Sequence, residues 1–126
     1  NYFINNYSPL SPDQILTLAQ HGPVQAHTAN HQYLSQLDYE SQLAEINQNV
    51  TYIEQITGQP VQFLAWPFGD HNSSAIEAAA ASGIIGAFGL NGSGCFLHSI
   101  DPYHVPRILM VVSDDLDTFA AKVSWW

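Results

Sequence analysis

Two histidines four residues apart, His27 and His31 in the stretch AHTANH, are the side chains of this sequence best suited to hold a metal ion. Neutral imidazole is a common ligand of zinc and similar cations. If the chain turns helical here, positions four apart share one helical face, and both rings can reach the same ion. Two imidazoles do not complete a zinc site, which uses three or four protein ligands. The alternative is a pair of ordinary surface or helix-cap histidines.

The stretch WPFGD, from Trp66 to Asp70, is a second candidate site because it follows an apolar run. Aromatic rings beside a polar pocket suit the apolar faces of sugars, and Gly69 lets backbone N–H groups approach a ligand closely. The alternative is a tight turn formed by Pro67 and Gly69, with the rings of Trp66 and Phe68 in the core. The residue types leave both interpretations open.

Four helices and four short strands are predicted around these sites from hydrophobic periodicity and helix-capping residues. The helices are expected within residues 11–22, 38–58, 73–83 and 113–123, and the strands at residues 24–26, 61–66, 84–90 and 105–111. Ser11 and Gln14 form a capping box for the first helix, and Ser73 or Ser74 is expected to cap the third.

Strands that alternate with helices indicate a parallel sheet with helices packed on it, because parallel neighbours need crossover connections. We therefore expect an α/β fold, formed as a single domain over residues 1–126. Functional residues of such folds gather at the carboxyl ends of the strands. Both candidate sites directly follow predicted strands.

The charge balance argues against nucleic acid as a partner. Eleven acidic residues stand against only Arg107 and Lys122, so the chain has few cations with which to replace phosphate counterions. No apolar run is long enough for a membrane span. Cys95 is the only cysteine, so no disulfide forms within these residues.

The two candidate sites together resemble motifs of the polysaccharide deacetylases, the NodB-homology carbohydrate esterases. AHTANHQYL resembles their His-Ser/Thr-x-x-His motif, and AWPFGDHN looks like the motif that ends in Pro-Tyr/Phe-Gly. SPDQILTLAQHGPVQAHT is similar to their preceding helix and strand, and DPYHVPRILM with DDLDTFAAKV looks like their ending. The resemblance spans most of the chain. It is closest to the subgroup acting on poly-N-acetylglucosamine of biofilms, in which alanine, here Ala65, replaces an arginine.

This resemblance implies a partial or reduced NodB-type (β/α) barrel and a metal-dependent hydrolase. The expected reaction removes N-acetyl groups from an N-acetylglucosamine-containing polysaccharide, outside the cell or at its surface. His27 and His31 would be ligands of a divalent metal, with zinc expected first, alongside one aspartate. The residues implied in substrate binding are Trp66, Pro67, Phe68, Gly69 and Asp70.

Two departures from the family pattern concern the catalytic groups. The family's first motif, a strand ending in Asp-Asp, supplies the general base and the third metal ligand, and no such strand precedes His27 here. The only Asp-Asp pair, Asp114 and Asp115, opens a predicted helix, where acidic residues satisfy the helix dipole. His98 is only a superficial match to the family's Leu-x-His motif for the catalytic acid. Neither the base nor the acid is therefore located.

An open half-barrel would expose a sheet edge that proteins normally cover. Another segment or chain could supply the missing part, the domain could close as a homo-oligomer, or the fold could be remodelled. Two alternatives to the enzyme stay open. One is a non-catalytic carbohydrate-binding or structural domain that kept the fold, and the other is a metal-binding module that recruits a ligand from a symmetry-related chain.

Overall fold

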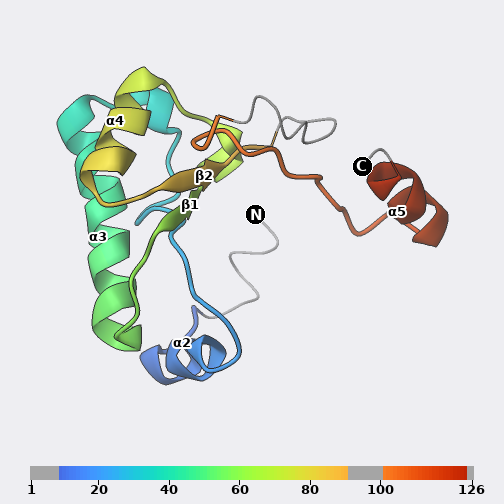
Figure 1. Ribbon diagram of the computed structural model, residues 1–126, viewed down its shortest axis with the longest axis horizontal. Helices are drawn as coiled ribbons and strands as arrows, with labels where there is room; N and C mark the ends of the chain where they lie inside the picture. The colour runs from blue at the N-terminus through green and yellow to red at the C-terminus, as the bar shows by residue number, and fades with distance from the viewer. Residues whose placement is uncertain (1–8, 91–100, 125–126) are drawn as a thin grey trace.

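A short parallel sheet lies at the centre of the computed structural model, which describes residues 9–90 and 101–124 (Figure 1). Strand β1 (Phe63–Ala65) pairs in parallel with β2 (Gly86–Phe88). Ala26 pairs with the other side of β1, and Val105 pairs with the other side of β2, both also in parallel. The order across the sheet therefore follows the order along the chain, and the predicted α/β class is confirmed.

The predicted strands at residues 24–26 and 105–111 are each reduced to a single pairing residue. At the first, the Gln25 side-chain oxygen accepts the Phe63 N–H (2.8 Å), which a longer parallel strand would give to a backbone carbonyl. At the second, Arg107 donates its Nε–H to the Gly89 carbonyl (2.9 Å), so a side chain again replaces the backbone partner. Both predicted strands were too long, because in each a side chain takes the place of the next backbone hydrogen-bond partner.

The helices begin where their capping residues place them. Helix α2 (Pro12–Ala19) has the predicted capping box of Ser11 and Gln14. Helix α3 (Tyr39–Thr57) is capped by Asp38 and ends at Gly58, whose φ of 67° is left-handed. The other regular segments are the 3₁₀ turns η1 (Leu34–Gln36) and η2 (Pro67–Gly69), helix α4 (Ser73–Ala81) and helix α5 (Leu116–Val123).

The N-cap of α4 is Asn72, and the prediction of Ser73 or Ser74 was wrong. The Asn72 side-chain oxygen accepts the Ala75 N–H (2.9 Å). The same oxygen also accepts a hydrogen bond from the buried Gln42 side chain of α3 (3.2 Å). This tertiary contact favours Asn72 over the neighbouring serines, which are equally good caps by residue type.

Helices α3 and α4 cover one side of the sheet, and α5 lies apart from them (Figure 1). Ile46, Val50 and Ile53 of the predicted apolar stripe of α3 are buried in the core, while Leu43 and Ile56 at its ends are partly buried. The opposite side of the sheet carries Phe63 and Phe88, whose ring centroids are 6.2 Å apart, and Phe63 is 39% exposed. The sheet does not close into a barrel over the described residues.

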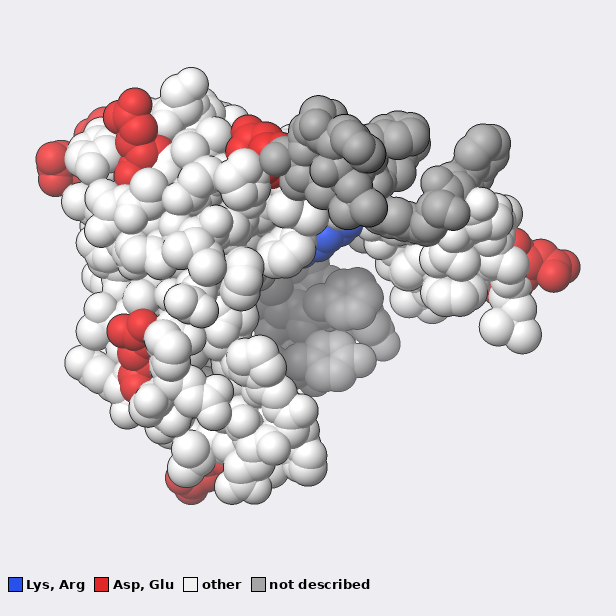
Figure 2. Space-filling view, in the orientation of Figure 1, with Lys and Arg blue, Asp and Glu red and all other residues white. Residues whose placement is uncertain are grey.

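The surface in view carries acidic side chains at separate points and a small basic area, and most of it is uncharged (Figure 2). Within residues 9–90 and 101–124, no helix has the length and apolar character needed to cross a membrane.

Candidate functional site

The carboxyl ends of two neighbouring parallel segments bring the two predicted sites together. His27 directly follows the pairing residue Ala26, and Phe68 lies in η2, which begins two residues after the last residue of β1. The ring centroids of His27 and His31 are 4.8 Å apart, and those of His31 and Phe68 are 4.6 Å apart. The two histidines and the aromatic residue therefore form one contiguous cluster on the surface.

The histidines are not brought together by a helix, as the spacing had suggested. Residues 27–31 form an irregular turn in which Thr28 (φ 64°) and His31 (φ 55°) have left-handed backbone conformations. The buried Thr28 hydroxyl oxygen accepts the His31 N–H (3.2 Å) and closes this turn. This contact gives a physical reason for a hydroxyl-bearing residue between the histidines.

Glu45 of α3 stabilises the same turn by accepting hydrogen bonds from it. Its buried carboxylate accepts hydrogen bonds from the Asn30 N–H (2.8 Å) and from the Asn30 side-chain amide (2.6 Å). Its backbone carbonyl also accepts the Ala29 N–H (3.0 Å). The sequence analysis assigned no role to Glu45, and no periodic pattern in the sequence marks its contact with the turn.

At the zinc site that the sequence predicts on His27 and His31, we expect Glu45→Gln to weaken binding by about tenfold, which is the usual cost of losing a group that orients metal ligands. Glutamine keeps the size of the side chain but replaces one of the two acceptor oxygens with a donor. Isothermal titration calorimetry with zinc measures the effect. Glu77→Gln, on the exposed surface of α4, is the matched control. Equal zinc affinity in the two variants would show that Glu45 does not position the turn.

His27 is oriented at both its backbone and its ring. Its N–H donates to the Asn49 side-chain oxygen (2.8 Å), and its Nδ1 lies 2.7 Å from the Ala65 carbonyl oxygen. Because a carbonyl only accepts, Nδ1 carries the proton and Nε2 keeps a free lone pair. Metal-binding histidines typically donate their other N–H to such a partner.

Burial lowers the pKa of His27 below its usual 6.5, and the hydrogen bond to Ala65 opposes this shift only in part. The nearby positive charges of His31 and Arg107 lower the pKa further. The neutral ring, which is the form that binds a metal, is therefore favoured near pH 7.

We expect this shift to make the metal-free protein more stable as the pH rises. Between the lowered pKa of folded His27 and 6.5 in the unfolded chain, the unfolded state binds more protons, so the free energy of unfolding increases with pH. The contribution is fully present above 6.5 and is lost as the pH falls through the folded pKa. Urea unfolding from about pH 5 to about pH 8 should show a shallower rise for His27→Gln than for the wild type. Parallel curves would contradict the assignment.

The stretch from Trp66 to Asp70 divides between the core and the surface. Trp66 is 0% exposed, and its indole N–H donates to the Tyr103 carbonyl (2.8 Å). Pro67 is also buried. Both side chains therefore lie in the core, which is the alternative that the residue types left open. Phe68 is 46% exposed and remains available at the surface.

Tyr33 is a surface aromatic residue that the sequence analysis missed. Its ring stacks on that of Phe68 with centroids 4.1 Å apart and planes 9° from parallel, and it is 46% exposed. Its position two residues after His31 was the only available signal. Together the two rings form an aromatic platform directly beside the histidines.

Gly69 and Asp70 shape the turn that carries Phe68. Gly69 has a left-handed φ of 70°, and an added Cβ would lie 2.9 Å from the Leu90 backbone nitrogen, so glycine is required here for close packing of the chain itself. The Asp70 carboxylate accepts hydrogen bonds from the Ser35 N–H (2.7 Å) and hydroxyl (2.8 Å). Asp70 thereby ties η2 to η1.

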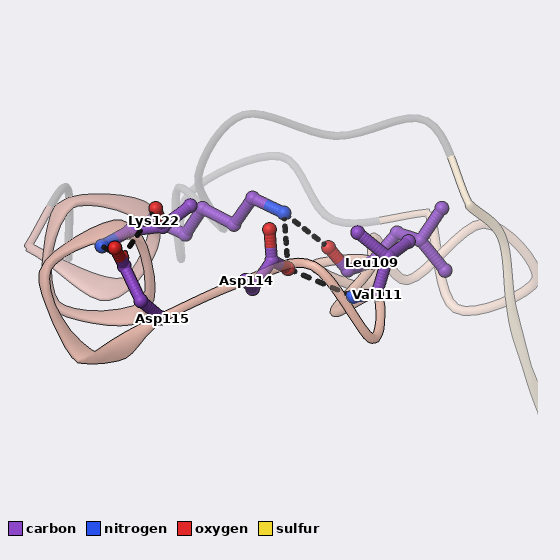
Figure 3. A network of polar contacts seen from close by, with 6 residues as sticks. Leu109, Val111, Asp114, Asp115 and Lys122 are labelled. Carbon is purple, nitrogen blue, oxygen red and sulfur yellow. Dashed lines mark hydrogen bonds and ion pairs between the residues drawn. The ribbon is translucent and has the colours of Figure 1, made fainter.

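Asp114 and Asp115 have structural partners of their own (Figure 3). Lys122 donates to the Asp114 carboxylate (2.6 Å), which also accepts the Val111 N–H, and the bond from Lys122 lowers the pKa of Asp114. Asp115 caps α5 by accepting the Thr118 N–H (2.8 Å). This pair is therefore occupied in forming the C-terminal helix.

The histidine pair fits a metal as two ligands of a larger set. Across residues 9–90 and 101–124, no group of three or more His, Cys, Asp or Glu side chains is assembled. His98 and Cys95 lie outside the described residues. The imidazoles of His27 and His31 are suitable zinc donors, and a third protein ligand does not come from the described part of the chain.

A family model for polysaccharide deacetylase matches residues 1–86. The chain belongs to the polysaccharide deacetylase family. No match was found among curated proteins. Among solved structures, the Streptococcus pyogenes deacetylase PplD in complex with acetate has a TM-score of 0.82 and 20% identity, over 94% of this chain and 53% of that one.

Two further deacetylase-family structures show the same fold. A Bacillus cereus polysaccharide deacetylase has a TM-score of 0.78 and 22% identity, over 94% of this chain and 38% of that one. A CE4 family pseudoenzyme from Bacillus anthracis has a TM-score of 0.58 and 18% identity, over 60% and 27%. The chain thus spans about half or less of the length of these relatives, and its described residues form a partial NodB-type fold.

Proposed function

We propose that this polysaccharide deacetylase chain carries the metal-binding and sugar-binding part of a hydrolase that removes N-acetyl groups from an N-acetylglucosamine-containing polysaccharide. The observation that carries the proposal is the contact of His27, with its free Nε2 lone pair, with His31 and through it with the exposed ring of Phe68. A metal ligand pair and an apolar platform for a sugar ring are thus adjacent.

Zinc is the proposed metal, with His27 and His31 as ligands. When bound, such a cation lowers the pKa of a water molecule and polarises the amide carbonyl. The Ala65 carbonyl fixes the proton of His27 on Nδ1, which leaves the lone pair of Nε2 for the metal. The remaining ligand and the general base would come from another segment or a second chain, including a second copy of this one.

The sugar is proposed to lie on the stacked rings of Tyr33 and Phe68. Aromatic faces bind the apolar faces of sugars, and an uncharged platform suits a neutral N-acetylated polymer. The backbone N–H of Phe68 is the proposed donor to the oxygen of the reacting acetyl group. A polymeric substrate of this kind places the protein outside the cell or at the cell surface.

Acetate release from a chitin oligomer tests the proposal directly. We expect release that requires zinc and is lost in both His27→Ala and His31→Ala, while His21→Ala, an exposed histidine outside the cluster, keeps it. Release that persists in the two variants would refute the metal site.

A non-catalytic sugar-binding domain is the second candidate, because the described residues supply no third ligand beside the histidines and a pseudoenzyme shares the fold. It predicts that the chitin oligomer binds with and without zinc, and that no acetate appears. Binding measured by calorimetry, alongside the acetate assay, separates the two candidates.

A further inference from the structure

A second pair of histidines, His71 and His104, lies in contact although the two residues are far apart in the sequence. His71 follows η2, and His104 directly precedes the pairing residue Val105. Nδ1 of His104 is 3.2 Å from Nε2 of His71, and the ring centroids are 5.0 Å apart. Both residues are half-buried. The deacetylase motifs described above give no role to either residue.

The ring of His71 is held in one orientation and one tautomer. Its Nδ1 lies 3.1 Å from the Gly69 carbonyl oxygen, so Nδ1 carries the proton and Nε2 directs its lone pair toward His104. Its face stacks on the buried indole of Trp66, with centroids 5.0 Å apart and planes 9° from parallel. The lone pair is therefore fixed before any ligand arrives.

The ring of His104 is held by its fit against the backbone. It lies over Gly89, where an added Cβ would be 3.1 Å from its Cε1 atom. Its own N–H donates to the Asp101 carbonyl (2.9 Å), which fixes the backbone at this position. A Cβ at residue 89 would force the ring to shift by a few tenths of an ångström, so glycine permits this close approach.

The gap between the two nitrogens suits either a shared proton or a shared cation. Two nitrogens that bind one tetrahedral zinc at about 2.0–2.1 Å lie about 3.3 Å apart, close to the 3.2 Å observed. The Gly69 carbonyl gives His71 the second hydrogen bond that is typical of metal ligands. The net charge of −9 favours cation binding over anion binding.

We propose that His71 and His104 form a second, weak metal site, in which Nε2 of His71 and Nδ1 of His104 supply two ligands of a zinc-like divalent cation and water supplies the others. This pair is separate from His27 and His31. If the two pairs lay within reach of one ion, they would form a group of three or more potential ligands, and the described residues contain no such group. The bound cation takes the place of the proton between the two rings. It links η2 to the segment that pairs with β2, so it stabilises the fold beside the proposed active site.

Zinc titration in a His27→Ala/His31→Ala background tests this site independently of the proposed function. We expect one zinc to bind per chain, and binding to weaken at least about tenfold when His104→Ala is added. The added His21→Ala change should leave binding as it was. No zinc binding in the background variant, or equal binding with and without His104, would overturn the proposal.

A further variant separates loss of the metal site from loss of folding, which the alanine variants could also cause. Gly89→Ala keeps both imidazoles, but its Cβ would press on the His104 ring and shift it by a few tenths of an ångström. We expect weaker zinc binding with unchanged far-ultraviolet circular dichroism. In the background variant, zinc should also shift the imidazole NMR signals of His71 and His104. Signals that stay in place while zinc binds would assign the ion elsewhere and overturn the proposal.

Discussion

His31→Ala will weaken zinc binding at the proposed catalytic site by about 100-fold or more, because it removes one of the two imidazoles that share the ion. Changes to groups that only orient metal ligands already cost about 10- to 100-fold in affinity, so loss of a ligand itself is expected to cost at least as much. The experiment is calorimetric titration with zinc in a His104→Ala background, which removes the second proposed site. His27→Ala is expected to act equally strongly.

The absolute affinity in this experiment carries separate information. Two imidazoles and water should hold zinc weakly, since catalytic zinc sites use three protein ligands. Tight binding that is lost with His31→Ala would mean that a third ligand reaches the site from outside the described residues or from another chain. Binding that is unchanged by His31→Ala would refute the proposal of a metal-dependent deacetylase and would favour the non-catalytic sugar-binding domain.

Trp66→Ala will destabilise the protein by about 3–5 kcal/mol, the usual cost of emptying a large buried aromatic site. The indole is fully buried, and its loss also leaves the Tyr103 carbonyl without its N–H donor. Phe68→Ala, two residues away, should change the free energy of unfolding by only about 1 kcal/mol, because its ring is exposed. Urea unfolding measures both effects.

Sugar binding should show the opposite order. Phe68→Ala removes half of the stacked platform and is expected to weaken binding of a chitin oligomer about tenfold, which corresponds to about 1.4 kcal/mol. Phe68→Tyr keeps the aromatic face and serves as the control. Trp66→Phe, which keeps most of the buried volume, should bind the oligomer normally. Loss of sugar binding in Trp66→Phe together with full stability would restore Trp66 as a substrate contact.

The different burial of Trp66 and Phe68 could not be predicted from the sequence. Both are aromatic residues beside a proline, and residue type alone could not separate a core position from a surface position. The difference arises from the turn: the left-handed φ of Phe68 turns its ring outward onto Tyr33. Local signals did predict the helices, because caps such as Ser11 with Gln14 act within a few residues.

The histidine cluster was predictable in composition but not in geometry. The motif placed His27 and His31 after a strand end, which is where they lie. The turn that joins them depends on Glu45, which is distant in the sequence, and the pairing of His71 with His104 depends on contact between separate segments. Neither contact leaves a periodic pattern that a single sequence displays.

The side chains of Gln25 and Arg107 also affect how this chain meets other polypeptides. Each side chain takes the place of the next backbone partner, so the regularly paired part of each described edge is only one residue long. Long exposed edges promote intermolecular β-sheet growth and insoluble aggregates. A partial barrel with such short paired edges is therefore a poor template on which a strand of a neighbouring molecule could extend the sheet.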